Sequence, residues 1–514
     1  MFTRRAFLTL AAQQRQRPNI LFVMVDEMRF DCMGCAGHQT AKTPTLDKLA
    51  KEGVLFRNAY TVSPVCCPSR ASVFSGRYPH IHGVKRNGLP HNNGEIFLPT
   101  ILKHYGYHTA IAGKLHYNPA RFSYGFDDFW TFTNEGPNPE NGHIEYLRKK
   151  HGRSASKWAR KPGTEPWPDD ELGRDVGEFA YPIEDFETEW ITDRSIAYLR
   201  LRARSQQPFF LFASYLKPHS PSVEPKPYFN LYDPASIPVV PLPKNAKEQR
   251  AKATGRTRRK CIDDEQMQRV MTALYYGAIT HIDTELARLF NELDRLGLAK
   301  NTVVLFTSDH GNMLGDRGLW FKDFMYEGSA HVPLIVKTPT AKPSEHRQII
   351  ENIDLMPTLL DYAKIPIPNG IQGRSFHALI EKGKQAKWKD RCISDLTATM
   401  HLAEGWKFID NHDGALELYN LNKDPQEKEN LVNDPRYKSR LHSAQSELAK
   451  WRAEQPAKIT VSGMATPDYA KVIVQYMECH AGFRSSPHSP HRPKTSTPYW
   501  KQSRPIRPGR SKNR

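Results

Sequence analysis

The sequence predicts an α/β fold built on a large sheet of mostly parallel strands. Strands buried on both faces of such a sheet are short, unbroken apolar runs, and three occur at residues 19–25, 208–215 and 301–307. Segments with helical periodicity lie between and around them, at residues 43–50, 187–202, 263–298 and 354–361. After about residue 386 the pattern changes to short strands and turns, which predicts a second, smaller unit.

The composition fits a large folded protein. With 514 residues, 39% hydrophobic and 25% charged, the chain is long enough to bury a large core and to form two domains. Its seven cysteines are odd in number, with four crowded between residues 32 and 67 and three scattered, which is not the pattern of a disulfide scaffold. Cys32 and Cys35 could form a redox or metal site, but with no second such pair two ordinary loop cysteines are favoured.

The formal net charge of +18 is concentrated in two segments. Residues 481–514 contain basic but no acidic side chains, and are rich in proline and serine, which predicts a flexible tail. A second basic run occupies residues 244–260. The basic run has no aromatic residue, and the tail has only Phe483, Tyr499 and Trp500. An acidic polysaccharide or a solvated segment is therefore favoured, and no nucleic-acid partner is expected.

The first residues resemble a twin-arginine export signal. Arg4 and Arg5 precede a short apolar stretch from Ala6 to Ala12, far too short to span a membrane. We therefore expect residues 1–17 to direct export to the periplasm or beyond, and we expect no integral membrane segment.

Acidic and imidazole side chains follow two of the predicted strands. Asp26 and Glu27 come directly after the first strand, and Asp309 and His310 follow the strand at residues 301–307. The carboxyl ends of parallel strands meet at one edge of a sheet, where ligands bind. Adjacent carboxylates repel unless a cation neutralises them, so a hard divalent metal is indicated, although an isolated pair is more often a solvated turn.

Cys66 lies where a loop enters a short apolar helix, and the chain is organised around this point. The first turn of a helix favours an anion or a nucleophile, and Arg70 adds donors suited to an oxyanion. From these residues alone, an activated thiol and a small buried hydrophobic residue are about equally favoured.

The motif around Cys66 decides between them by resemblance. Cys66-x-Pro68-Ser69-Arg70, continued to Gly76-Arg77, resembles the maturation motif of type I sulfatases in the alkaline phosphatase-like superfamily. The resemblance implies that a formylglycine-generating maturation enzyme converts Cys66 to formylglycine (3-oxoalanine), whose hydrate attacks sulfur. It also implies a mixed, mostly parallel sheet between helices, followed by a C-terminal α+β domain with a short antiparallel sheet.

Other segments also match motifs of this family. Without that match, the residues named below would be interpreted as ordinary surface or turn residues. The implied metal ligands are Asp26, Glu27, Cys66, Asp309 and His310. Glu27 stands where the family usually has Asp, and His310 where many relatives have Asn. The implied catalytic side chains are Cys66, Arg70, Lys114, His116, His219 and Lys322, with Lys217 and His310 contacting the substrate. His219 would protonate the leaving alcohol, and His116 would take the proton of the second hydroxyl of the hydrate.

The resulting prediction is a sulfuric ester hydrolase that cleaves a sulfate monoester on a sulfated saccharide. The expected ion is Ca²⁺ by resemblance, with Mg²⁺ or Mn²⁺ as alternatives. The competing interpretations are a phosphonate or phosphate diester hydrolase of the same superfamily, and a non-catalytic glycan-binding relative. We expect a catalytic domain at residues 18–380, a C-terminal subdomain at 381–480, and an irregular insertion over the site at 133–185.

Overall fold

The computed structural model describes six stretches of the chain, residues 17–92, 95–133, 136–164, 176–241, 264–383 and 388–455. The predicted export signal, apart from Arg17, lies outside these residues, as do the basic run at 244–260 and the tail at 481–514. Among the described helices, none combines the length and the hydrophobicity needed to cross a membrane.

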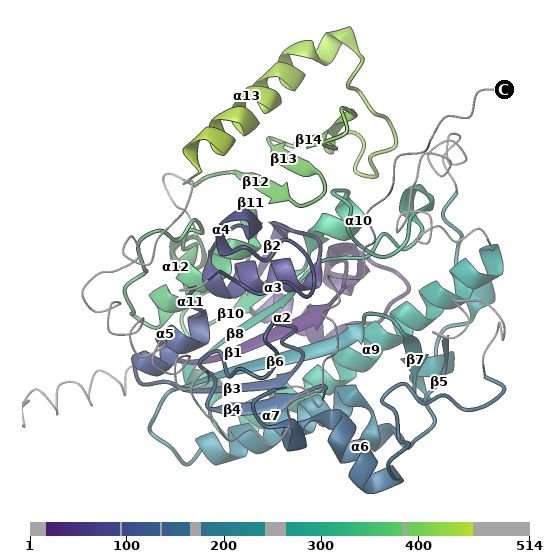
Figure 1. Cartoon of the computed structure of the whole chain (residues 1–514), viewed down its shortest axis with the longest axis vertical. Coiled ribbons are helices and arrows are strands. Elements are labelled where there is room, and N and C mark those ends of the chain that lie inside the picture. The colour runs from purple at the N-terminus through teal and green to yellow at the C-terminus, as the bar shows by residue number, and fades with distance from the viewer. Residues whose placement is uncertain are drawn as a thin grey trace, which may run out of the picture.

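A mixed nine-stranded sheet forms the centre of the molecule, which confirms the predicted fold class (Figure 1). Its strand order is β11-β2-β10-β8-β1-β6-β3-β4, and β9 pairs with β2. Most neighbouring strands are parallel, whereas β10 runs antiparallel to β2 and β8. The strands are β1 (Asn19–Asp26), β2 (Val54–Tyr60), β3 (His108–Gly113), β4 (Asp128–Thr131), β6 (Phe209–Pro218), β8 (Thr302–Ser308), β9 (His331–Val332), β10 (Leu334–Lys337) and β11 (Ser344–Glu351).

Helices cover both faces of this sheet because its strands alternate apolar side chains between two cores. Ile20, Phe22 and Met24 of β1 belong to one core, and Leu21, Val23 and Val25 belong to the other. The first core is completed by α3 (Cys66–Ser75), α5 (Leu98–His104), α11 (Leu355–Tyr362) and α12 (His377–Lys382). The second core is completed by α2 (Pro44–Glu52), α7 (Glu187–Arg202) and α9 (Glu265–Arg295).

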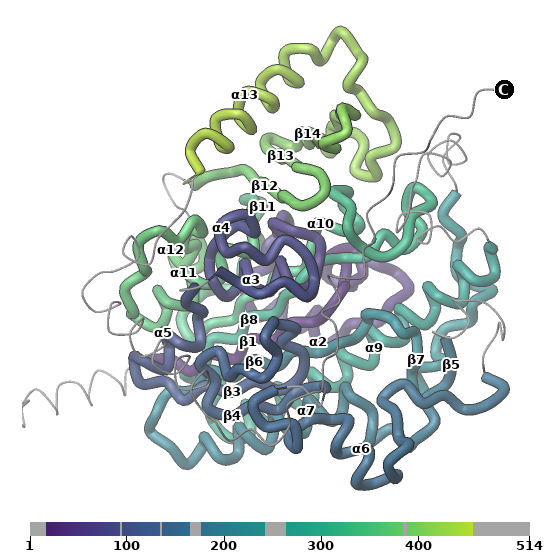
Figure 2. Tube along the Cα trace, viewed as in Figure 1, coloured from purple at the N-terminus to yellow at the C-terminus, as the bar shows by residue number. Residues whose placement is uncertain are grey.

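The C-terminal part forms a separate four-stranded antiparallel sheet at one end of the molecule, where the yellow-green tube gathers in Figure 2. Helix α13 (Lys438–Glu454) packs on it through Leu448 and Trp451. Tyr60 and Met325 of the larger unit share a core with the opposite face of this sheet. Its strands are β12 (Arg391–Asp395), β13 (Thr399–Ala403), β14 (Trp406–Asp410) and β15 (Leu416–Asn420).

The segment at 133–185 is more regular than its sequence indicates. It contains α6 (His143–His151) and β5 (Val176–Glu178), which pairs with β7 (Ser222–Glu224). The expectation of a segment without helix or strand was therefore wrong. The aliphatic side chains of α6 are few, with Ile144 and Leu147 buried among charged residues, so its periodicity is weak in the sequence. Two short helices, α4 (Pro79–His82) and α10 (Glu327–Ala330), complete the α-helices of the residues that the structure describes.

Candidate active site

The candidate site lies at the carboxyl edge of the central sheet, where four neighbouring strands end. Asp26 is the last residue of β1 and pairs with Pro218 of β6 after a register shift that follows Met24, while Val25 pairs with Ser308 at the end of β8. Gly113, at the end of β3, pairs with Ser214 of β6. A side chain at Gly113 would place its Cβ 1.9 Å from the Ser214 carbonyl oxygen, so only glycine allows β3 to deliver Lys114 here.

Cys66 is the first residue of α3, which packs on one face of the sheet and brings Cys66 to the same edge. Its Sγ lies 3.2 Å from His310 Nε2 and 3.7 Å from Asp26 Oδ1. Burial alone would raise the pKa of this thiol, but Lys114, Lys322 and His310 hold the pKa well below its usual range. Its surroundings therefore stabilise negative charge on the atom at this position.

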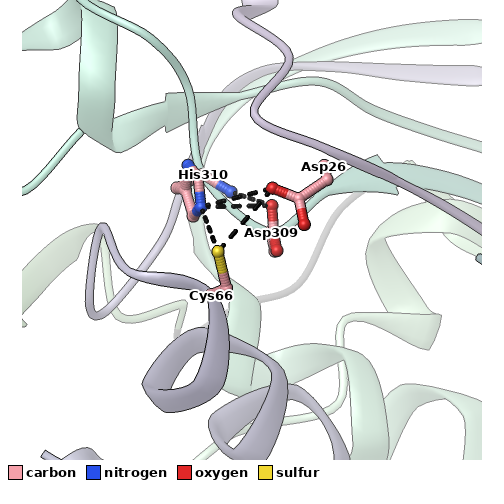
Figure 3. Close-up of side chains that lie close together, drawn as sticks. All are labelled: Asp26, Cys66, Asp309 and His310. Atoms are coloured by element: carbon pink, nitrogen blue, oxygen red, sulfur yellow. Dashed lines mark hydrogen bonds and ion pairs between the residues drawn. The ribbon is translucent and has the colours of Figure 1, made fainter. Parts of the chain in front are cut away.

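Cys66, Asp26, Asp309 and His310 form a compact group of possible metal ligands (Figure 3). All four are buried, and one donor atom from each lies within 4.8 Å of the others. His310 Nδ1 faces the Gly311 carbonyl oxygen at 2.9 Å, which leaves Nε2 directed at Cys66 and the two carboxylates. Two carboxylates and an imidazole suit a divalent cation, with the side chain of residue 66 as a fourth ligand.

Buried cations balance these carboxylates. Arg70 is fully buried, and its Nε donates to Asp309 Oδ2 at 2.7 Å while its Nη2 donates to Asp26 Oδ2 at 3.2 Å. Lys114 also donates to Asp26, and Lys322 Nζ lies 3.0 Å from Cys66 Sγ. Three basic side chains thus converge on the space around Cys66, an arrangement suited to a tetrahedral anion.

Glu27 lies beside this group but contacts other side chains. Its Oε2 is 3.1 Å from Lys322 Nζ and 3.4 Å from His219 Nε2, and its Oε1 accepts from Asn312 Nδ2 at 2.8 Å. Together with Asp26 and His219 it forms a second possible ligand group among the described residues. Its role as a metal ligand therefore stays a prediction, and the structure places it between two predicted catalytic side chains.

His116 takes up an unusual backbone conformation next to Cys66. Its φ of 62° lies in the left-handed region, which non-glycine residues rarely occupy and which is often found at functional sites. Its carbonyl oxygen accepts from the Cys67 thiol at 2.8 Å, and Tyr117 Oη donates to the Arg70 carbonyl oxygen at 2.6 Å. Burial, and then Lys114, lower the pKa of His116, which favours a neutral imidazole able to accept a proton.

Lys217 is the predicted substrate residue that the structure places elsewhere. Its side chain is 2% exposed, donates to the Pro221 carbonyl oxygen at 2.6 Å and lies 3.2 Å from Glu224. Its direct substrate contact stays a prediction, but the contacts observed are those of a buried ion pair.

Two polar residues of the site, Asn312 and Ser214, were not predicted from the sequence. Asn312 holds Glu27 and also accepts from the Leu314 and Phe321 amides, shaping the loop that carries Lys322. Ser214 accepts from Arg70 Nη1 at 2.8 Å. Asn312 follows His310 by two residues, so its place after the strand was an available signal, whereas Ser214 lies inside an apolar strand and gave none.

Comparisons with known proteins agree with this geometry. The family model named Sulfatase matches residues 18–365, and the model described as N-sulphoglucosamine sulphohydrolase, C-terminal, matches residues 315–454. The chain is 34% identical to an arylsulfatase of Clostridium perfringens, over 84% of this chain and 94% of that protein. It is 30% identical to a choline-sulfatase of Rhizobium meliloti, over 82% of this chain and 83% of the relative.

A solved structure of similar fold carries a different activity in its name. The phosphonate monoester hydrolase of Silicibacter pomeroyi superposes with a TM-score of 0.74 at 25% identity, covering 88% of this chain and 99% of that structure.

Proposed function

Because this chain belongs to the sulfatase family and is a sulfuric ester hydrolase, we propose that it cleaves a sulfate monoester with a formylglycine made from Cys66. One observation carries this proposal: Cys66 Sγ lies 3.2 Å from His310 and 3.0 Å from Lys322 within a buried group of ligand-bearing side chains. The modification exchanges a thiol for an oxygen function at a position whose neighbours favour an anion.

The residues present also fit a divalent cation, with Ca²⁺ as the proposed ion. Asp26, Asp309 and His310 would hold it together with the oxygen of modified residue 66. When bound, the ion supplies a Lewis acid that neutralises ester oxygens and favours an ionised hydroxyl on residue 66.

The remaining steps belong to the side chains of this protein. Lys114 and Lys322 place positive charge where the sulfuryl oxygens gather negative charge, and Arg70 keeps the two carboxylates in position. His219 donates a proton to the leaving alcohol from Nε2. His116, which is hydrogen-bonded to the Cys66 side chain, accepts a proton from residue 66 after the ester bond is broken.

The proposed substrate is a sulfated saccharide. The C-terminal family match, to residues 315–454, carries the name of an enzyme acting on a sulfated glucosamine, and the net charge of +18 favours an anionic substrate. Sulfate release from a panel of sulfated mono-, di- and polysaccharides, measured against aryl and choline sulfates, tests this. A preference for the simple esters would contradict it.

A second candidate is phosphonate ester hydrolysis, favoured by the likeness to the Silicibacter pomeroyi enzyme. Matched phenyl sulfate and phenyl phosphonate esters separate the two activities, because they share a leaving group and a single negative charge and differ in the central atom and in the carbon substituent of the phosphonate. We expect the larger kcat/KM for the sulfate. The opposite order would replace the proposed function with this one.

We also propose that the protein is exported and that a formylglycine-generating enzyme matures it. The paired arginines at Arg4 and Arg5, followed by a short apolar stretch, support export. Cell fractionation of the full chain and of an Arg4→Lys, Arg5→Lys variant measures this, and retention of the native chain in the cytoplasm would contradict it.

A further inference from the structure

The side chain of Lys217 holds together the turn that carries His219. The ammonium of Lys217 donates to the carbonyl oxygen of Pro221, two residues beyond His219, at 2.6 Å. The same ammonium lies 3.2 Å from Oε1 of Glu224 on β7. One side chain thus binds both the end of the turn and the strand that follows it.

Lys217 and His219 face different surroundings. On β6, Leu211, Ala213 and Tyr215 pack into the core shared with α7 and α9, and the two-residue period of a strand puts Lys217 on the same face. There its ammonium lies 5.5 Å from the centre of the Phe186 ring. His219 is 23% exposed and reaches Glu27 in the active site, whereas Lys217 is 2% exposed.

A line of alternating buried charges extends from Lys217 into the helices. Glu224 Oε2 lies 3.1 Å from His281 Nδ1 on α9, and His281 Nε2 lies 2.7 Å from Glu189 Oε1 on α7. Burial lowers the pKa of His281, but Glu189 and Glu224 outweigh it and raise the pKa to about 9. The His219 turn is therefore connected through Lys217 to two long helices rather than held by its own backbone alone.

The orientation of His219 depends on this turn. Its amide donates to the Leu216 carbonyl oxygen at 3.1 Å, and its Nδ1 is hydrogen-bonded to the Ser220 carbonyl oxygen. The contact with Ser220 lies inside the segment between Lys217 and Pro221, and the contact with Leu216 joins His219 to the residue just before Lys217. They leave Nε2 directed at Glu27, 3.4 Å from its Oε2.

We infer that Lys217 is a positioning residue for His219, acting through the buried Lys217–Glu224 ion pair and not through contact with the substrate. This inference rests on the proposed function, in which His219 protonates the leaving alcohol. Loss of the ion pair then weakens proton donation selectively. A general acid matters most when the leaving group is a poor one, so the loss depends on the alcohol released.

The test compares Lys217→Met with His219→Ala on aryl sulfates whose leaving phenols range from acidic to weakly acidic. For Lys217→Met we expect kcat on the poorest leaving group to fall about 10- to 100-fold, and on 4-nitrophenyl sulfate less than about threefold. In a His219→Ala background, the added Lys217→Met change should have almost no further effect. Each preparation is normalised to its content of modified Cys66, measured by mass spectrometry.

Two further variants separate positioning from general damage. Lys389→Met removes a partly exposed ammonium paired with the buried Glu351 outside the site, and should leave the leaving-group dependence unchanged. Glu224→Gln keeps the shape of its side chain and breaks the same ion pair from the other side. It should give the same selective loss as Lys217→Met, and it serves as the test if Lys217→Met does not fold.

The outcomes distinguish the inference from the function beneath it. An equal loss for all leaving groups, or a raised KM that persists in the His219→Ala background, overturns the positioning role and restores direct substrate contact by Lys217. If His219→Ala lowers kcat by the same factor for every leaving group, His219 is not the proton donor. The proposed role of His219 and the inference about Lys217 then both fail.

Discussion

At the scale of single residues, the site depends on buried carboxylates whose charge is balanced by neighbouring basic side chains. Asp26 and Asp309 are fully buried, and each would be costly there without Arg70, whose guanidinium contacts both. Burial raises the pKa of Asp26, but its neighbours Lys114, His219 and Lys322 hold that pKa well below its ordinary range. Asp26 therefore stays ionised and available to a cation.

Replacement of Cys66 tests the nucleophile at this scale. Cys66→Ala should keep the fold, because the thiol is small, and should lower kcat for sulfate release at least about 10³-fold. The neighbouring Cys67→Ser is the matched control, since serine retains a donor to the His116 carbonyl oxygen. Comparable turnover of Cys66→Ala and native protein would contradict the mechanism.

Removal of the metal tests the ligand group. We expect chelation to abolish sulfate release and Ca²⁺ to restore it, because Asp26, Asp309 and His310 are placed to share one ion. Asp309→Asn should weaken the ion's affinity, measured by titration calorimetry. Undiminished activity in a protein shown by elemental analysis to be free of metal would contradict the assignment.

At the scale of elements, the site is formed where β8, β1, β6 and β3 end side by side. The sequence predicted three of these strands from unbroken apolar runs, and it predicted α7 at residues 187–202 with the bounds observed. It did not predict β11 or β13. Ser344, Glu345 and Arg347 make β11 polar at the edge of the sheet. The strand β13 buries the polar residues Thr399 and His401, so it has no unbroken apolar run in the sequence.

The same limit applies to the site. Asp26, Asp309 and Cys66 follow strands or begin a helix, so their convergence could be expected from the sequence. The contact between Lys217 and Glu224 could not, because it depends on which face of β6 points toward α9. Long-range hydrogen bonds, such as that from Asn312 to Glu27 across 285 residues, also leave no local signal.

The ion pairs of His281 connect α9 to α7 and to β7, and their contribution to stability depends on pH. The pKa of His281 in the folded protein is about 9, above its ordinary value of 6.5. Its stabilising contribution, up to about 3 kcal/mol, is fully present below the ordinary value and is lost as pH rises through about 9. His281→Gln should flatten the decrease in urea midpoint between pH 7 and pH 10, and an unchanged slope would contradict this.

At the scale of the whole molecule, the C-terminal sheet is fastened to the loop that carries Lys322. Lys407 of β14 is fully buried and lies 2.6 Å from Glu327 and 2.7 Å from Glu427. Glu327 follows Lys322 by five residues, and its amide donates to Glu427 at 2.8 Å. The smaller sheet therefore supports the loop of the larger unit that carries Lys322.

Breaking this connection tests that role. Lys407→Met leaves two buried carboxylates without their cation, and should lower the free energy of unfolding by about 3 to 5 kcal/mol and also reduce kcat. The exposed Lys450→Met change on α13 is the control and should leave the urea midpoint unchanged. If Lys407→Met were as stable and active as the native protein, the C-terminal sheet would not support the loop.

The central claim is that residue 66 carries an aldehyde when the enzyme is active. Mass spectrometry of the tryptic peptide spanning residues 58–70, recovered from protein with measured sulfate release, tests this most directly. We predict that residue 66 has exchanged its sulfur and two hydrogens for oxygen, and that specific activity rises in proportion to the modified fraction. A peptide that retains its Cys66 thiol in fully active protein would contradict the account.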